Sequence, residues 1–368
     1  MSSISVNTIT DASGGSTTTI NGFTPSVSNM AGRNRIINGG MVFDQRNAGV
    51  LQTSIGNNTF ITDRFSYQRA GLGITAVFNC QQSTTAPTGF ENSAYLTATT
   101  GQTLGASGGA YMMYRHVIEG FNIANALRSQ SNVTISFWTY FSNSGTYSLV
   151  ATNAVDRSYA TTYTVTTANT WQKITLTIPL TASGGTWNYT NGIGLELRFT
   201  LDAHDDVCTA SNNAWVSTNS YGASGQTHGK VTSGATFYIT GVQLEEGSVA
   251  TPFCPAGGGS YGAELALCQR YYCELGRQIF GRAESGTITT MVGAFPVQMR
   301  SSPSVNVITS TNAIAIPGQT SSNISSVLTN NCNDNGMSLG IQTSGSSMSP
   351  PGPTVGDKNR IFGFTAEL

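Results

Sequence analysis

Short runs in which apolar and polar side chains alternate are the clearest pattern in this chain. A period of two residues places every second side chain on one face of a β-strand, so each run predicts a strand that is buried on one side only. The clearest runs cover residues 134–141, 171–178, 194–201 and 235–240. Clusters of Ser, Asn and Gly between the runs favour tight turns. The pattern indicates an all-β protein with an antiparallel jelly-roll sandwich over residues 33–255.

A helical period appears only after the predicted sandwich. Apolar residues recur there every three or four positions, which predicts an amphipathic helix over residues 261–275. Ser260 can cap its start and Gly276 its end. The residues that would form one apolar seam are Tyr261, Leu265, Cys268, Tyr272 and Leu275. This seam either joins three copies of the chain or packs on the chain's own sandwich.

The remaining segments complete a four-part order. Residues 1–32 are polar and contain few aromatic residues, so they read as an arm that becomes ordered on a partner. The strand that begins at Thr236 should give way to a polar block at residues 241–247, and a linker with the helix should occupy residues 256–276. Shorter strand-like runs predict a smaller β domain over residues 277–368, with its last strand paired in a sheet. Residues 111–127 read as a strand followed by a short helix.

Several of these segments resemble parts of bacteriophage tail fibre and tail receptor-binding proteins, of the podovirus or cyanophage type. Gln243-Leu244-Glu245-x-Gly247 followed by residues 261–272 resembles a segment that recurs in them. Residues 34–49, NRIINGGMVFDQRNAG, resemble their opening strand. Residues 7–15 with 20–22 resemble the extreme N-terminus of such fibres, and residues 295–303 resemble their tail. The sandwich pattern itself is similar to galactose-binding-like jelly rolls and carbohydrate-binding modules.

The resemblance implies a non-catalytic structural protein of the virion tail that is assembled in the host cytoplasm. It implies docking to other tail proteins through residues 1–32, a homotrimer, and attachment to a host-surface glycan. Two alternatives stay open. One is a capsid decoration or neck protein built from the same sandwich, and the other is a polysaccharide depolymerase.

Composition narrows the choice of partners. Charged residues make up 10% of the chain and the net charge is −1, so the surface lacks the clustered Lys and Arg that phosphate contacts need. We therefore expect no nucleic-acid binding. We also expect neither membrane insertion nor a signal peptide, since the sequence has no long apolar run and its first residues lack a basic and apolar region. The six cysteines are scattered without a CxxC pair, which favours reduced thiols.

The densest polar cluster is a candidate for Ca²⁺ binding. Its possible ligands are Asp202, His204, Asp205 and Asp206. The alternative is a solvated turn directly after a strand, and we expect no other cofactor.

Catalytic signatures are missing from the sequence. It contains no GxSxG, and neither His116 nor His228 has the sequence neighbours of a nucleophilic triad. Glu245 and Glu246 are adjacent on a strand and should point to opposite faces, which suits polar structure better than a pair of catalytic carboxylates. We therefore expect no enzyme activity.

Aromatic residues in turn-rich stretches are the candidates for sugar binding, because all-β modules hold sugars on aromatic platforms. Trp215 and Tyr221 lie in a long polar loop, and Trp187 and Tyr189 lie in a shorter connection. Trp187 either folds back onto the sheet or contributes to the platform. Trp138 and Trp171 lie in regular strands and are expected in the core. We expect the receptor at the loop around Trp215 or at the C-terminal domain, whose turn-rich segment 329–336 can present hydrogen-bonding groups.

Overall fold

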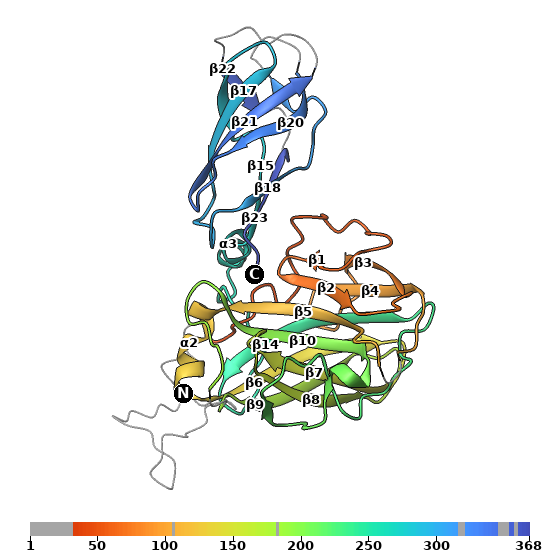
Figure 1. Ribbon diagram of the computed structural model, residues 1–368. Coiled ribbons are helices and arrows are strands. Elements are labelled where there is room, and N and C mark those ends of the chain that lie inside the picture. The colour runs from red at the N-terminus through yellow and green to blue at the C-terminus, as the bar shows by residue number, and fades with distance from the viewer. Residues whose placement is uncertain (1–31, 105–106, 182–183, 316–320, 345–352, 357–359) are drawn as a thin grey trace, which may run out of the picture.

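The computed structural model describes residues 32–104, 107–181, 184–315, 321–344, 353–356 and 360–368. The predicted arm therefore lies outside the described residues, except for Gly32. Strands take up 46% of the chain and helices 7%, which confirms the all-β fold. The chain forms a large sandwich, a short helix and a smaller β-rich part that projects from one end of the sandwich beyond that helix (Figure 1).

Two antiparallel sheets form the sandwich. One sheet has seven strands in the order β1 (Thr59–Thr62), β2 (Phe65–Ala70), β5 (Tyr111–Glu119), β10 (Ile193–Ala203), β7 (Gly145–Thr152), β8 (Ser158–Val165) and β12 (Trp215–Val216). The other has five strands in the order β3 (Val77–Ser83), β4 (Ser93–Thr100), β14 (Thr236–Glu246), β6 (Asn132–Phe141) and β9 (Gln172–Pro179). The four strands expected from the clearest alternating runs are all present. The expected strand and helix after residue 111 are β5 and α2 (Gly120–Ser129).

The core between the sheets is made by alternate residues of facing strands. Phe65, Tyr114, Phe137, Phe199 and Phe237 are all fully buried in it. Their neighbours in sequence point away from the core, as the period of two requires. A short parallel pair, β11 (Cys208–Thr209) and β13 (Gly222–Ala223), and a 3-10 turn (Asp205–Val207) belong to the long segment between β10 and β14, which also contains β12.

Strand β14 extends through the segment that we predicted to be a polar block. Its pairing with β6 shifts register between Thr240 and Gln243 and then continues to Glu246. Gly241 takes a φ of +62° at this bulge, a conformation that glycine adopts without strain. The polar residues remain in the strand because they find partners there. Glu245, which is buried, accepts hydrogen bonds from Gln243 and Thr251, whereas Glu246 pairs with Arg35. As expected, the two glutamates serve separate polar contacts.

The smaller part contains two further sheets. One has the order β15 (Tyr272–Leu275), β23 (Phe362–Thr365), β18 (Ser304–Val307). The other has the order β19 (Ile314–Ala315), β22 (Pro353–Gly356), β16 (Phe280–Ala283), β17 (Ile288–Ala294), β21 (Gly336–Ser344), β20 (Asn323–Asn330). They enclose a second core that includes Met291, Leu339, Phe362 and Phe364. The prediction that the last strand is paired is confirmed, since β23 has a partner on each side.

The predicted helix over residues 261–275 is too long. Helix α3 covers Tyr261–Gln269, and Ser260 caps its start by accepting a hydrogen bond from the amide of Ala263 at 3.4 Å. Gly276 does not end the helix, because β15 forms a ladder with β23 between the two. The backbone of residues 272–275 bonds to a strand distant in sequence, which the local helical period could not reveal.

The predicted apolar seam is consequently divided. Tyr261 is 67% exposed, Leu265 and Cys268 face the junction between the two parts, and Tyr272 and Leu275 lie on a strand. The five residues therefore do not line one side of a helix. The homotrimer remains a prediction, but it loses this seam as its basis.

Residues 34–49 form no strand, contrary to the resemblance. Side chains, and not a partner strand, bind backbone groups of this segment. Asn34 accepts from the amides of Ile36 and Leu244, and Asn38 binds the amide and carbonyl of Phe43. Asn38 and Met41 have positive φ values of 60° and 58°, which turn the chain out of an extended path. The segment folds as a series of turns between the sandwich and α3.

The described residues agree with the expectation of reduced cysteines. All six cysteines are free thiols. Neither helix in the described ranges has the length and apolar character needed to span a bilayer.

Candidate functional sites

Four aromatic rings form a row across the outer face of the five-stranded sheet. The register pairs Tyr95 with Tyr238 and Tyr238 with Tyr140, and it places Trp171 opposite Tyr140, just before β9. The ring centroids of successive members are 4.6, 5.4 and 5.6 Å apart. All four side chains are partly exposed. We call these four residues the sheet row.

Polar side chains border the sheet row on both sides. Gln81 continues the same line on β3, and the paired residues Thr97 and Thr236 lie on the line next to it. On the other side, Trp138 pairs with Lys173, which is exposed. Burial and the neighbouring Tyr95 raise the pKa of Tyr238 to about 12, so its hydroxyl remains a hydrogen-bond donor at neutral pH. Neighbouring strands are about 4.8 Å apart, so the row spans roughly 14 Å.

The seven-stranded sheet offers no comparable open face where its central strands lie. Its outward-facing residues there, such as Met113, Glu196 and Thr200, are buried. The segment after β10 covers them: Arg198 bonds to Asn219 and Ser220, and Thr200 bonds to the carbonyl of Tyr221. The five-stranded sheet is thus the face of the sandwich on which aromatic rings remain accessible.

The sequence misplaced Trp138 and Trp171. Both were expected in the core, but both belong to the outward-facing positions of their strands and are partly exposed. Phe137 and Ile174 point inward, and both tryptophans lie an odd number of positions from them along their strands. This spacing could have indicated that the tryptophans face outward. Aromatic residues in an alternating strand look like core residues until one knows which face is covered.

Three of the four predicted platform residues come together at an edge of the sandwich. Trp187 and Trp215 meet edge to face, with ring centroids 5.5 Å apart. Both indole N–H groups donate to backbone carbonyls, of Gly184 at 2.9 Å and of Pro179 at 2.6 Å. Tyr189 lies beside Trp187, under the guanidinium of Arg128. Trp187 packs on the core, as expected if it folds back onto the sheet, and it also lines a surface hollow.

The Trp187–Trp215 pair, which we call the tryptophan ridge, separates two hollows. One hollow has a volume of about 370 Å³ and is lined by Arg157, Tyr159, Asn213 and Trp215 among others. The other has a volume of about 360 Å³ and is lined by Arg128, Gln130, Trp187 and Tyr189 among others.

Tyr221 does not belong to the ridge. Its ring stacks on Tyr111, with centroids 3.9 Å apart and planes at 12°, and the Arg198 guanidinium lies 4.2 Å from its centre. These contacts hold the covering segment against the seven-stranded sheet. Tyr221 therefore has a structural role here, because its loop folds over a sheet and leaves Trp215 at the edge.

The four candidate metal ligands point to different partners. Asp206 accepts from the amides of Gly108 and Gly109, and His204 accepts from the amide of Ala110 at 3.1 Å. Asp202 and Asp205 both bind His228, at 2.9 and 3.0 Å. In the described part of the chain, no three such side chains are grouped to hold a metal ion. The cluster ties loops together, and only Asp205 and Asp206 belong to a turn after the strand, because Asp202 is buried within β10 and His204 is buried as well.

Cys208 lies close to this cluster, where a nucleophile could be suspected. Burial raises the pKa of its thiol to about 12, and the carboxylates of Asp205 and Asp202 add to the shift. The thiol is therefore protonated at neutral pH and is a poor nucleophile.

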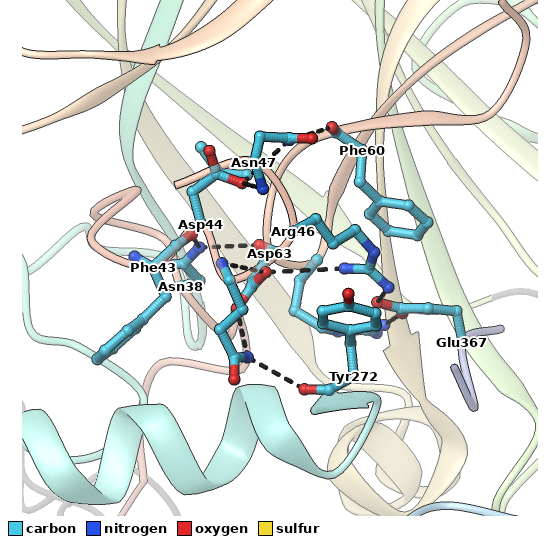
Figure 2. A network of polar contacts seen from close by, with 12 residues as sticks. Asn38, Phe43, Asp44, Arg46, Asn47, Phe60, Asp63, Tyr272 and Glu367 are labelled. Carbon is cyan, nitrogen blue, oxygen red and sulfur yellow. Dashed lines mark hydrogen bonds and ion pairs between the residues drawn. The ribbon is translucent and has the colours of Figure 1, made fainter. Parts of the chain in front are cut away.

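A buried polar network joins the sandwich to the smaller part (Figure 2). Asp63 binds Gln45 through both carboxylate oxygens, and Gln45 also donates to the carbonyl of Tyr272 at 3.0 Å. The Arg46 guanidinium lies 3.8 Å from the centre of the Tyr272 ring and donates to Glu367 at 3.0 Å. Burial raises the pKa of Asp63 to about 6, although Arg46 opposes the shift.

Helix α3 is attached to the same junction by a second set of contacts. Glu264 accepts from the amides of Asn38 and Gly257, both at 2.5 Å. Arg64 packs on the ring of Tyr271 and pairs with Glu367. The residues that carry the phage resemblance, 34–49 and 261–272, thus lie side by side in the structure. They form a joint between two cores.

Comparison with known proteins yields only distant likenesses. No protein-family model matches the sequence, and no curated protein matches it. A putative sugar-binding protein from Bacteroides thetaiotaomicron aligns with 58% of this chain and 100% of its own, at 11% identity and a TM-score of 0.31. A structure described as "CBM4 structure and function" aligns with 58% of this chain and 99% of its own, at 16% identity and a TM-score of 0.29.

The enzymatically active domain of bacteriophage CBA120 tailspike protein 4 aligns with 53% of this chain and 21% of its own, at 12% identity and a TM-score of 0.27. TM-scores this low support no transfer of function. A function for this chain must therefore be inferred from its own residues.

Proposed function

We propose that this chain is a non-catalytic attachment protein of a bacteriophage tail and that it binds a glycan on the host surface. The sheet row carries the binding part of the proposal. Four contacting aromatic rings on an open sheet, bordered by Gln, Thr and Lys side chains, suit the apolar faces and hydroxyl groups of sugars. A row of roughly 14 Å would hold a few consecutive sugar rings of an extended chain.

The phage part of the proposal rests on the sequence resemblance and is supported by the place of the matching segments. Residues 34–49 and 261–272 build the joint between the sandwich and the smaller part. A fibre subunit needs such a joint, because the sandwich and the smaller part must keep a fixed orientation when the attached virion exerts force on one of them. We propose docking to other tail proteins through residues 1–32 and a homotrimer, whose threefold display would strengthen weak sugar contacts by avidity.

Attachment without catalysis is supported by how the buried carboxylates are used. Asp44, Glu119, Glu196 and Glu245 each bind arginine, amide or hydroxyl groups of the fold. Glycoside hydrolysis needs two carboxylates that face each other across a substrate cleft. The sheet row is bordered by amides, hydroxyls and one lysine, which can bind a sugar but offer no such pair.

Purified virions test the role. Antibodies against the chain should label the tail in immunogold electron microscopy, and the protein should be present in far fewer copies than the major capsid protein. Labelling spread over the capsid at high copy number would favour the decoration protein. Reducing-sugar release from host surface polysaccharide would establish the depolymerase, and a chain absent from virions would end the proposal.

A further inference from the structure

We infer that the tryptophan ridge is a second glycan site, distinct from the sheet row and selective for acidic sugars. The inference goes beyond the proposed function, since the two sites would read different chemistry on the host surface. It begins with the orientation of the rings. Both indole N–H groups are bound to backbone carbonyls, so each ring is held in place and only its apolar surface remains for a ligand.

Each hollow beside the ridge contains one arginine. Arg157 lines the hollow of Trp215, where it also bonds to Ser217, and Arg128 lines the hollow of Trp187. Arg128 is exposed and lies 4.9 Å above the ring of Tyr189. Neither arginine forms an ion pair within the described residues, whereas Arg46, Arg64, Arg115, Arg198 and Arg270 all do. Two cations, neither of them in an ion pair among the described residues, thus flank a pair of aromatic rings.

The carboxylate closest in sequence does not neutralise them fully. Asp156 accepts hydrogen bonds from Asn153 at 2.7 Å and from the amide of Thr186 at 3.0 Å. These bonds, with a smaller effect of Arg157, hold the pKa of Asp156 below its ordinary value. One negative and two positive charges leave the edge with a net charge of about +1, on a chain whose total is −1.

This arrangement fits a polysaccharide whose sugar rings carry carboxylates. A sugar ring in either hollow would pack its apolar face on an indole, and its carboxylate would reach the fork of a guanidinium, which binds carboxylates in a bidentate manner. Gln130 and Asn213 border the hollows and could bind hydroxyl groups. A neutral sugar would gain only the stacking contacts.

The test is calorimetric titration of the full chain with a hexamer of galacturonic acid and with the same hexamer fully methyl-esterified. We expect the acid form to bind about tenfold more tightly than the ester, because the ester has no negative charge to pair with the guanidinium and cannot accept from it as a bidentate carboxylate. Raising NaCl from roughly 0.05 to 0.5 M should remove most of the difference. Equal affinity for the two hexamers would overturn the inference.

Matched variants locate the site. Arg128→Gln should weaken acid binding several-fold, and Arg157→Gln should do the same, whereas Arg277→Gln, which removes an exposed charge from the smaller part, should change nothing. Arg128 makes only a surface contact to Tyr189, so its variant keeps the test sharp if Arg157→Gln loosens the loop. Loss of acid binding in Trp171→Ala with no effect of Arg128→Gln would place the acidic sugar on the sheet row and overturn the inference. If neutral glycans failed to bind while acid binding stayed intact, the result would contradict the proposed glycan site at the sheet row and not the inference about the tryptophan ridge.

Discussion

Arg270 donates two hydrogen bonds, of 2.6 and 2.9 Å, to the carboxylate of Glu119. Arg270 follows the last residue of α3 and Glu119 ends β5, so the pair ties the helix to the seven-stranded sheet. The hydroxyl of Tyr271 donates a third bond to the same carboxylate at 2.6 Å. Since Glu119 is 1% exposed, these contacts are what makes its charge tolerable in the fold.

Arg270→Leu should therefore lower the free energy of unfolding by about 3 kcal/mol, because it leaves a buried carboxylate without its cation. Urea unfolding followed by tryptophan fluorescence measures the loss. Arg277→Leu is the matched control, since Arg277 is exposed and should be nearly neutral. Equal effects of the two substitutions would mean that the pair does not hold the helix.

The Glu119 carboxylate also makes the stability of the fold depend on pH, and the sign of this dependence follows from its pKa. Burial alone would raise the pKa of Glu119, but the hydrogen bonds from Arg270 and Tyr271 hold it below its ordinary value of 4.5. A lowered folded pKa contributes stability that is complete above the ordinary value and is lost as the pH falls through the folded one.

The difference in unfolding free energy between wild type and Glu119→Gln should therefore be constant above pH 4.5 and shrink below it. Asp63 has a raised pKa of about 6, so its effect on the pH dependence of stability has the opposite sign. Comparing the two proteins at each pH cancels this effect, because both contain Asp63. A difference that grows on acidification would contradict this account.

Gly241 should tolerate no side chain. A Cβ there would lie 2.5 Å from the Phe90 ring and 3.0 Å from the Trp138 ring, and its φ of +62° adds strain. Gly241→Ala is expected to cost about 2–3 kcal/mol in thermal or urea unfolding. Gly234→Ala is the control, because its φ is +80° but a Cβ there meets nothing within 4 Å. The difference between the two variants measures the clash alone.

The sheet row predicts which residues bind neutral glycans. Trp171→Ala and Tyr140→Ala should each weaken binding of the host polysaccharide about tenfold, because each removes a stacking surface. Phe121→Ala removes an aromatic ring that is 62% exposed on α2, which carries no residue of the sheet row, and should leave affinity unchanged. Affinity that is lost equally in all three variants would point to a general effect on folding.

His228 should titrate above its ordinary pKa of 6.5. Burial lowers the pKa, but the bonds to Asp202 and Asp205 outweigh it and raise it. A raised folded pKa means that the stability contributed is complete below 6.5 and is lost as the pH rises through the folded value. His228→Gln should therefore lose up to about 1 kcal/mol at pH 6 and less at pH 8. NMR titration of the imidazole measures the midpoint, and a midpoint below 6.5 would contradict the bridge.

Local periodicity determined much of the sandwich. The alternating runs at β6, β9, β10 and the first half of β14 lie within one or two residues of the observed strands, because a half-buried strand imprints a period of two on its own sequence. The cap of α3 at Ser260 was equally local, since one hydroxyl and one amide three residues away define it. The choice of Trp187, Trp215 and Tyr189 as surface aromatics in turn-rich stretches also came from the sequence.

Only the tertiary structure decided the contacts between segments that are distant in sequence. Tyr272–Leu275 looks helical by its own spacing, but pairing with Phe362–Thr365 makes it a strand. Tyr221 and Trp215 share one loop, yet that loop folds over a sheet and separates them. Trp138 and Trp171 read as core residues because a strand's period gives its two faces without saying which one a second layer covers. Burial depends on what packs on a face, and in this protein the covering segment lies on the other sheet.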